Sequence, residues 1–232
     1  KKKKNPLPRS AKEREGLLLV GDKMASEGSA MGHKTRTFNK NSRLYHILQR
    51  TFKKLTVEGL DELVQLPEGY DLHEWLASHV TEFYNLTLLM FGTVSEYVTE
   101  EAFPKMSAGP KYEYRWPVDG KPQTVPAKVY CENLFSWAEE LVYSWPEETS
   151  SSKPVEEQYP PTFMRDVKDI MKRLFRVYAF MYYHLFQQHS DLDNEKHLNT
   201  TFRHFMTFVR AFDLIPASEE EPLAEIIKRL EL

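Results

Sequence analysis

Residues 163–186 read FMRDVKDIMKRLFRVYAFMYYHLF, and this stretch decides the fold. Its apolar residues recur at steps of three and four, the spacing that lines one face of an α-helix. They are Phe163, Val167, Ile170, Met171, Leu174, Val177, Tyr178, Met181 and Leu185. No Gly or Pro interrupts the stretch, and Thr162, which follows two prolines, is the expected N-cap. We therefore predict a central core helix.

The same stretch carries a dense basic face. The cations of its first half are Arg165, Lys168, Lys172, Arg173 and Arg176. Because most of them are three or four residues apart, they project from one side of the predicted helix. A core helix with such a face is a candidate anion site. Internal ion pairs, for instance between Asp169 and Arg173, are the alternative that the residues alone leave open.

Composition bounds the class of protein. A chain of 232 residues with 41% hydrophobic content is expected to form one globular domain with a sizeable core. The formal net charge of −3 gives no bulk attraction to nucleic acid or membranes. The single cysteine, Cys131, excludes an internal disulfide, and no apolar run is long enough to span a membrane. We therefore expect a soluble intracellular protein in the cytoplasm.

Residues 1–40 differ from the rest, because they combine eleven Lys/Arg with four Asp/Glu and little apolar content. We predict a flexible basic N-terminal arm over 1–40 and a folded domain over 41–232. Lys1–Lys4 is a candidate nuclear-import signal, with plain solubilising charge as the alternative. A nucleic-acid binder acting through this arm is a further hypothesis, but the overall charge makes it unlikely to be the main function.

Helical patterns separated by breakers fill most of the folded domain. Apolar spacing predicts helices over 44–55, 60–64, 71–91, 93–97, 127–145, 198–212 and 218–232. Asp71 is the expected N-cap of the helix over 71–91, and Gly92 is its expected C′ residue. Ser218 and Glu221 have the spacing of a capping box at the start of the last helix.

One region breaks this pattern. Prolines at 104, 110, 117, 122 and 126 forbid a long helix over 99–128. Tyr112, Tyr114 and Trp116 alternate with charged residues, and Asp119-Gly120 is a turn signal, so we predict a small β-hairpin here. The fold class is thus an all-α bundle built round a long central helix, with a small β-hairpin insertion.

No catalytic motif is present. The sequence contains no Gly-rich phosphate loop, nucleophile elbow, HExxH pair or kinase motif, and its histidines lack metal-ligand spacing. We predict that the chain is not an enzyme and needs no cofactor, with a metallohydrolase as the rejected rival.

The predicted helix over 71–91 carries a candidate protein-binding face. Its apolar residues are expected to face inward: Leu72, Trp75, Leu76, Val80, Phe83 and Leu86. Asp71, Glu74 and Glu82 are spaced so that they can share one exposed side of it. Carboxylates next to exposed aromatic residues suit a basic helical partner, and a plain solvated face is the alternative.

Several of these segments together closely resemble the MOB (Mps-one binder) kinase co-activator family. They are Leu66-Pro-Glu-Gly69, Met106-Ser-Ala-Gly-Pro110, Tyr112-Glu-Tyr114-x-Trp116, Lys172-Arg-Leu-Phe-Arg-Val-Tyr-Ala179 and His197-Leu-Asn-Thr-x-Phe-x-His-Phe205. The resemblance runs in order and at family spacing from Tyr45 to Leu232, so the folded domain is identified as a MOB domain with a MOB-type helical bundle.

The resemblance implies a non-catalytic adaptor. Such proteins bind the N-terminal regulatory region of NDR/LATS-type AGC kinases in mitotic-exit, morphogenesis or Hippo-like signalling. Asp71, Glu74, Trp75 and Glu82 are then the expected kinase-binding residues. The alternative is a scaffold that binds phosphothreonine segments of upstream Ste20/Hippo-type kinases without activating a kinase directly. Lys172, Arg173 and Arg176 match the family's phosphate-binding triplet, and guanidinium groups suit phosphate through bidentate hydrogen bonds.

The resemblance also implies two modifications of the usual pattern. Thr37 lies in the segment that upstream kinases phosphorylate in this family, whereas the family's second phosphorylated threonine is replaced by Lys54. The four positions that usually hold zinc are Val98, Phe103, Phe180 and Leu185 here. All four are apolar, so we predict that this chain binds no metal and that a hydrophobic cluster fixes the loop instead.

Overall fold

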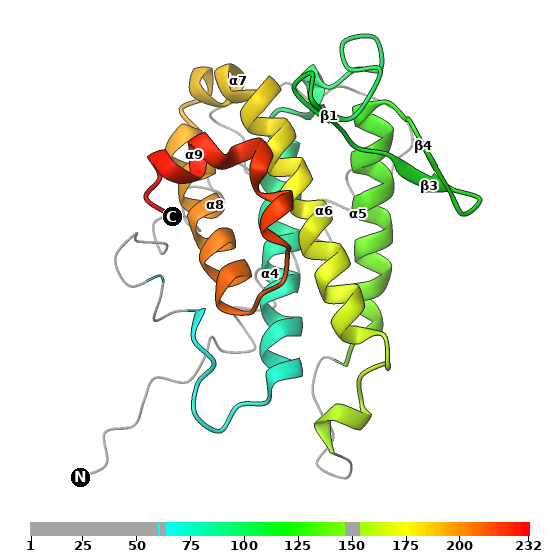
Figure 1. Cartoon of the computed structure of the whole chain (residues 1–232), viewed down its shortest axis with the longest axis vertical. Helices are drawn as coiled ribbons and strands as arrows, with labels where there is room; N and C mark the ends of the chain where they lie inside the picture. Colours follow the sequence, from blue (N-terminus) through cyan, green and yellow to red (C-terminus); the bar gives the residue numbers. More distant parts are fainter. Residues whose placement is uncertain (1–59, 61–63, 147–153) are drawn as a thin grey trace. The chain divides into compact units, whose positions relative to one another are not determined.

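The computed structural model describes Leu60, residues 64–146 and residues 154–232, all within one compact unit (Figure 1). Its long helices are α4 (Leu72–Gly92), α5 (Ala127–Ser144), α6 (Phe163–His184) and α8 (Glu195–Ala211). Shorter helices are α7 (Phe186–Asp191) and α9 (Ala224–Arg229). The predicted helical bundle with a small β insertion is confirmed. The predicted arm over 1–40, the helix over 44–55 and Thr37 lie outside the described residues.

Helix α6 is the centre of this bundle. It packs against both α4 and α5, and α8 packs against α4, so the four long helices run side by side (Figure 1). Every apolar residue predicted for its buried face is at most 2% exposed. Burial of a large apolar side chain is worth about 1.5–3 kcal/mol, so this face supplies much of the driving force for folding. The prediction of a central core helix is confirmed.

The start of α4 was predicted correctly and its end was not. The Asp71 carboxylate accepts hydrogen bonds from the backbone N–H groups of His73 (2.7 Å) and Glu74 (3.3 Å), as an N-cap does. Gly92 is the last residue of the helix rather than its C′ residue. Thr93 ends the helix instead, because its hydroxyl donates to the Met90 carbonyl at 2.8 Å and satisfies one of the last acceptors.

Two other predicted caps lack the expected side-chain bonds. Thr162 is the N-cap residue of α6, as predicted, but its hydroxyl donates to the Asp166 carboxylate (2.6 Å) and accepts no bond from the helix N–H groups. Ser218 forms no capping box, and 3₁₀ turns over Ala217–Glu219 and Glu221–Leu223 precede α9. Pro222 lacks the N–H that would donate to the Ser218 carbonyl in a helix starting there, so the helix begins later.

The predicted short helix over 93–97 is a 3₁₀ turn over Ser95–Tyr97. Residues 99–128 form two antiparallel hairpins rather than one. Strand β1 (Ser107–Ala108) pairs with β2 (Tyr112–Glu113), and β3 (Trp116–Val118) pairs with β4 (Lys121–Gln123). The predicted Asp119-Gly120 turn joins β3 and β4, with φ of 49° and 74°, as a type I′ turn requires.

The first hairpin is held against the end of α6. His184 Nε2 lies 3.1 Å from the Ser107 carbonyl oxygen and 3.3 Å from the Ser107 hydroxyl. Gly109 has a φ of 73° and lies under the ring of Tyr183, where a Cβ atom would overlap the ring. Within the described part of the chain, no helix combines the length and the hydrophobicity needed to cross a bilayer.

Candidate functional site

The first candidate site lies at the N-terminal end of α4. The indole N–H of Trp75 donates to the Val64 carbonyl oxygen at 3.1 Å, and its ring is half-buried against Tyr70 and His79, with centroids 6.3 and 4.2 Å away. These contacts fix the orientation of the indole. Trp75 is thus a rigid part of the surface rather than a mobile side chain.

Exposed apolar residues adjoin the predicted acidic ones. Leu66, Tyr70 and Leu72 are 39%, 37% and 37% exposed, which makes them three of the most exposed large hydrophobic residues among those described. Leu72 was expected to face inward, but it precedes the first buried turn of α4 and points to solvent. We call Leu66, Tyr70, Asp71, Leu72, Glu74 and Trp75 the α4 surface.

The predicted kinase-binding residues are not all in one place. Asp71, Glu74 and Trp75 lie in the first turn of α4, where one Asp71 oxygen is already occupied as the helix cap. Glu82 is half-buried and lies eight residues further along, a separation of about 12 Å along the helix axis. The structure therefore places three of the four residues together and Glu82 at one edge.

The second candidate site is the predicted phosphate-binding triplet on α6, whose three cations all have internal partners. Lys172 Nζ donates to Asp169 Oδ1 at 2.7 Å. Arg176 forms a bidentate ion pair with Glu219, with Nη2 to Oε1 and Oε2 distances of 2.8 and 3.1 Å. Internal pairing was the alternative interpretation of this face, although Asp169 pairs with Lys172 and not with Arg173.

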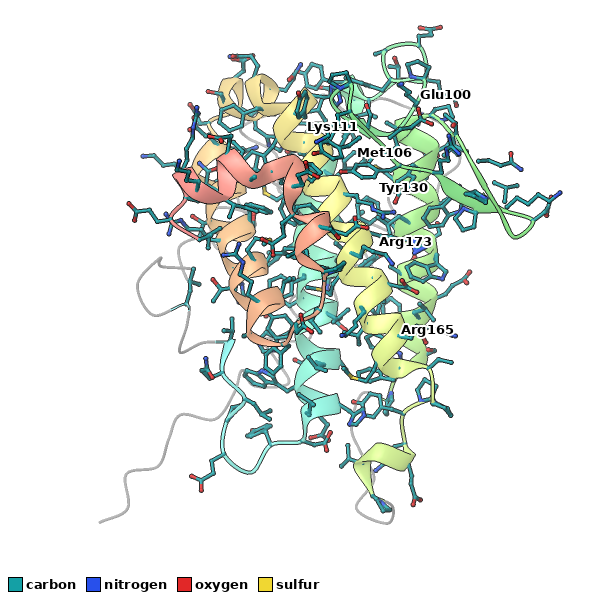
Figure 2. All side chains as sticks on the ribbon, viewed as in Figure 1. Glu100, Met106, Lys111, Tyr130, Arg165 and Arg173 are labelled. Carbon is teal, nitrogen blue, oxygen red and sulfur yellow. The ribbon has the colours of Figure 1, made fainter. Side chains whose placement is uncertain are left out.

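Arg173 is held by aromatic rings. Its guanidinium carbon lies 5.1 Å from the ring centre of Trp116 on β3 and 4.8 Å from that of Trp137 on α5. Figure 2 shows Arg173 on the side of α6 that faces α5. Cation–π contacts of this kind orient a guanidinium while leaving its N–H groups able to donate. This pairing could not be predicted from local sequence patterns, because the three residues are far apart along the chain.

Arg176 lies in a less exposed place. Its guanidinium is 5.1 Å from the ring centre of Tyr114, and its side chain is only 19% exposed. Burial acts to lower the pKa of Arg176, but the hydrogen bonds that it donates to Glu219 raise this pKa above its ordinary value. Burial likewise raises the pKa of Tyr130, and the positive charge of Arg176 opposes that rise. Arg176 therefore stays charged beside two neutral tyrosines.

The carboxylate partner of Arg176 belongs to a run of three glutamates near the C-terminus. Glu219 pairs with Arg176 on α6, Glu220 pairs with Arg210 on α8 at 2.6 Å, and Glu221 pairs with Lys111 at 2.6 Å. Each glutamate thus contacts a different part of the domain. The sequence analysis assigned none of them to the site, and only the tertiary structure brings Glu219 to the triplet.

The four positions that the family resemblance assigns to zinc are apolar and largely buried in this chain. Val98, Phe180 and Leu185 are at most 2% exposed. The ring of Phe103 meets Phe180 edge to face, with centroids 5.1 Å apart. Neither a sulfur nor a nitrogen ligand stands at any of these positions, and the described residues contain no group of three or more His, Cys, Asp or Glu placed to hold a metal ion. The side chains present therefore do not fit a zinc ion.

Comparisons with known proteins agree with this arrangement. Residues 52–223 match the Mob1/phocein family. The chain is 45% identical over 176 residues to MOB kinase activator-like 1B of Arabidopsis thaliana, covering 74% of this chain and 80% of that protein. It is 38% identical over 209 residues to MOB kinase activator-like 1 homolog A of Dictyostelium discoideum, covering 86% and 96%. It is also 38% identical over 200 residues to MOB kinase activator 3A of Mus musculus, covering 84% and 90%.

MOB kinase activators are non-catalytic regulators, in agreement with the prediction that the chain is not an enzyme. The match covers both candidate sites and every long helix of the bundle. The chain belongs to the Mob1/phocein family and is a homologue of the MOB kinase activators.

Proposed function

We propose that the chain is a kinase co-activator that binds the N-terminal regulatory region of an NDR/LATS-type AGC kinase through the α4 surface and Glu82. The observation that carries the proposal is the exposure of Leu66, Tyr70 and Leu72 beside the carboxylates of Asp71 and Glu74. Large apolar side chains that remain in solvent are typical of a surface that another protein covers.

The chemistry of this surface suits a basic amphipathic helix. Its apolar residues offer anchors for the partner's apolar face, and the carboxylates complement Lys or Arg at the rim. Trp75 adds an aromatic ring already fixed by its bond to Val64, so little conformational entropy is lost when a partner packs on it. Binding activates the kinase only if the adaptor favours the active arrangement of that region.

A binding titration tests the proposal. The full chain is titrated against the N-terminal regulatory region of each NDR/LATS-type kinase of the host, beside a Glu74→Lys/Glu82→Lys variant. We expect tight binding that the variant weakens at least about tenfold, because charge reversal replaces attraction with repulsion. The matched control is Glu100→Lys/Glu101→Lys, which reverses two exposed charges outside α4. Equal binding by both variants would contradict the proposed surface.

We infer a second binding function for the triplet, namely recognition of phosphothreonine segments of Ste20/Hippo-type upstream kinases. The cation–π contacts of Arg173 with Trp116 and Trp137 favour this second function. They orient the guanidinium, and no carboxylate partner of Arg173 is among the contacts described above. A phosphorylated upstream kinase of this type can also modify Thr37, which is proposed as a phosphorylation site.

Peptide pools test this second function. Three fluorescent pools with degenerate flanks carry phosphothreonine, threonine or glutamate at the central position. The phosphothreonine pool is expected to bind, and Arg173→Glu should abolish that binding while sparing the AGC kinase. Loss of both interactions in that variant would mean that the two surfaces are not separate.

We also propose that the cluster of Val98, Phe103, Phe180 and Leu185 takes the place of a structural metal. Its support is the burial of three of these side chains and the edge-to-face contact of Phe103 with Phe180. Metal analysis of the purified, chelator-washed protein is the test. Zinc at one ion per chain would overturn the proposal.

A further inference from the structure

The pairing of Arg176 with Glu219 has a consequence for what the triplet can bind. Three contacts join the guanidinium to the carboxylate, including Nε to Oε2 at 3.2 Å. The two side chains are only 19% and 23% exposed, so solvent screens their attraction poorly. Glu219 thus occupies the Nε–Nη2 edge of the guanidinium, the edge that binds a carboxylate or phosphate in a bidentate way. An incoming anion that uses this edge must first displace Glu219.

The two residues that follow Glu219 anchor this segment. Glu220 forms an ion pair with Arg210, and Glu221 forms one with Lys111. These contacts keep the segment over α6 even while a single side chain swings away. A displaced Glu219 carboxylate therefore remains close to Arg176 at an effective concentration on the order of millimolar or above.

We propose that Glu219 sets the affinity threshold of the triplet: its carboxylate acts as an internal competitor at Arg176, so that a phosphate dianion, which can contact all three cations, still binds whereas a single peptide carboxylate does not. This inference rests on the proposed phosphate binding by Lys172, Arg173 and Arg176. The inference goes beyond that function in two ways. It assigns a role to Glu219, which lies outside the triplet, and it excludes peptide carboxylates as ligands; we call this exclusion the selection rule.

The selection follows from the chemistry of exchange. A glutamate or aspartate of a partner offers Arg176 one negative charge and two acceptor oxygens, the same as Glu219 does. Replacing Glu219 with such a carboxylate therefore gives no net gain in free energy, and the tethered Glu219 stays bound to Arg176. A phosphothreonine carries about −1.5 to −2 charges and three acceptor oxygens. It can hold Arg176 while also reaching Arg173 and Lys172, so the exchange is favourable.

The three peptide pools with central phosphothreonine, threonine or glutamate are the probes. They are titrated against the full-length chain and against Glu219→Gln, which removes the competing charge but keeps the size of the side chain. Glu220→Gln is the matched control, because it makes the same change of charge one residue away and breaks the pair with Arg210 instead.

We expect wild type to bind the phosphothreonine pool and to bind the glutamate pool no better than the threonine pool. Glu219→Gln should bind the glutamate and the phosphothreonine pools each at least about fivefold more tightly than wild type does, because the competitor weakens the binding of both anions by the same factor. Glu220→Gln should leave both affinities unchanged. Unchanged affinities in Glu219→Gln, or an equal change in both variants, would overturn the role of Glu219.

A second measurement does not depend on the stability of the variant. In wild type, the phosphothreonine pool should shift the NMR resonance of the Glu219 side-chain carboxyl carbon, because phosphate displaces this carboxylate from Arg176. An unchanged Glu219 resonance in a chain that binds the pool would refute the displacement alone. Failure of both wild type and Glu219→Gln to bind the phosphothreonine pool would instead refute the proposed phosphate site, and the selection rule with it.

Discussion

His189 gives the chain an acid-sensitive core. Its side chain is completely buried, neither ring nitrogen has a hydrogen-bond partner within the described residues, and the equally buried amide of Asn194 has none there either. Burial lowers the pKa of His189 from 6.5 to about 4. The imidazole is therefore neutral in the folded protein at pH values where the unfolded chain already protonates it.

The sign and size of the effect follow from this difference. Between pH 6.5 and pH 4 the unfolded state binds one more proton than the folded state, so the free energy of unfolding falls as the pH falls. From pH 7 to pH 5 the loss is about 2 kcal/mol, and it levels off at about 3 kcal/mol below pH 4. For a domain of ordinary stability this is a large fraction of the total.

Urea unfolding at pH 7 and pH 5 measures this loss. Wild type is compared with His189→Gln, whose side chain cannot be protonated in this range. Because burial also lowers the pKa of His197, a half-buried residue, His197→Gln is the matched control. We expect His189→Gln to remove most of the pH dependence and His197→Gln to remove little. Parallel losses of stability in wild type and His189→Gln would refute the reasoning.

Three substitutions test the local structure. Phe180→Ala should lower the free energy of unfolding by about 3–5 kcal/mol in urea, because it opens a cavity beside Phe103, whereas a chelator should leave the melting temperature of wild type unchanged. Asp71→Ala should cost about 1 kcal/mol through loss of the α4 cap, and Asp71→Asn should restore most of it in the same assay. Gly109→Ala should cost at least about 1–2 kcal/mol, because its φ of 73° is strained for alanine and the new Cβ overlaps Tyr183; thermal unfolding that matches wild type would contradict this.

The fold could be predicted from the sequence because its long helices carry their own signals. The apolar spacing of residues 163–186 is local, and every residue that it assigns to the core is buried. Local signals failed where a side chain had a competing partner. Thr162 occupies the N-cap position of α6, but its hydroxyl donates to the Asp166 carboxylate and makes no cap bond. The last helix starts later than predicted for a backbone reason, since Pro222 has no N–H to donate to the Ser218 carbonyl.

The candidate sites were predictable only as sets of residues. The sequence identifies Lys172, Arg173 and Arg176 as neighbours on one helix. Lys172 pairs with Asp169 on that same helix, but the partners of Arg173 and Arg176 come from elsewhere in the chain. Glu219 is 43 residues from Arg176. The rings of Trp116 and Trp137 approach Arg173 from a strand and from another helix. Periodicity within one segment contains no information on contacts of this range. The partners of Arg173 and Arg176 could therefore be identified only from the tertiary structure.

The proposed replacement of a structural metal by Val98, Phe103, Phe180 and Leu185 is energetically feasible. A structural zinc ion contributes about 10 kcal/mol or more in small zinc-binding peptides. Burial of Val98, Phe180 and Leu185 is worth together about 5–9 kcal/mol, and the aromatic contact of Phe103 with Phe180 adds about 1 kcal/mol. The two totals are similar, so packing can supply most of the stability that a metal would give. The hydrogen bond of His184 to Ser107 also ties the first hairpin to α6.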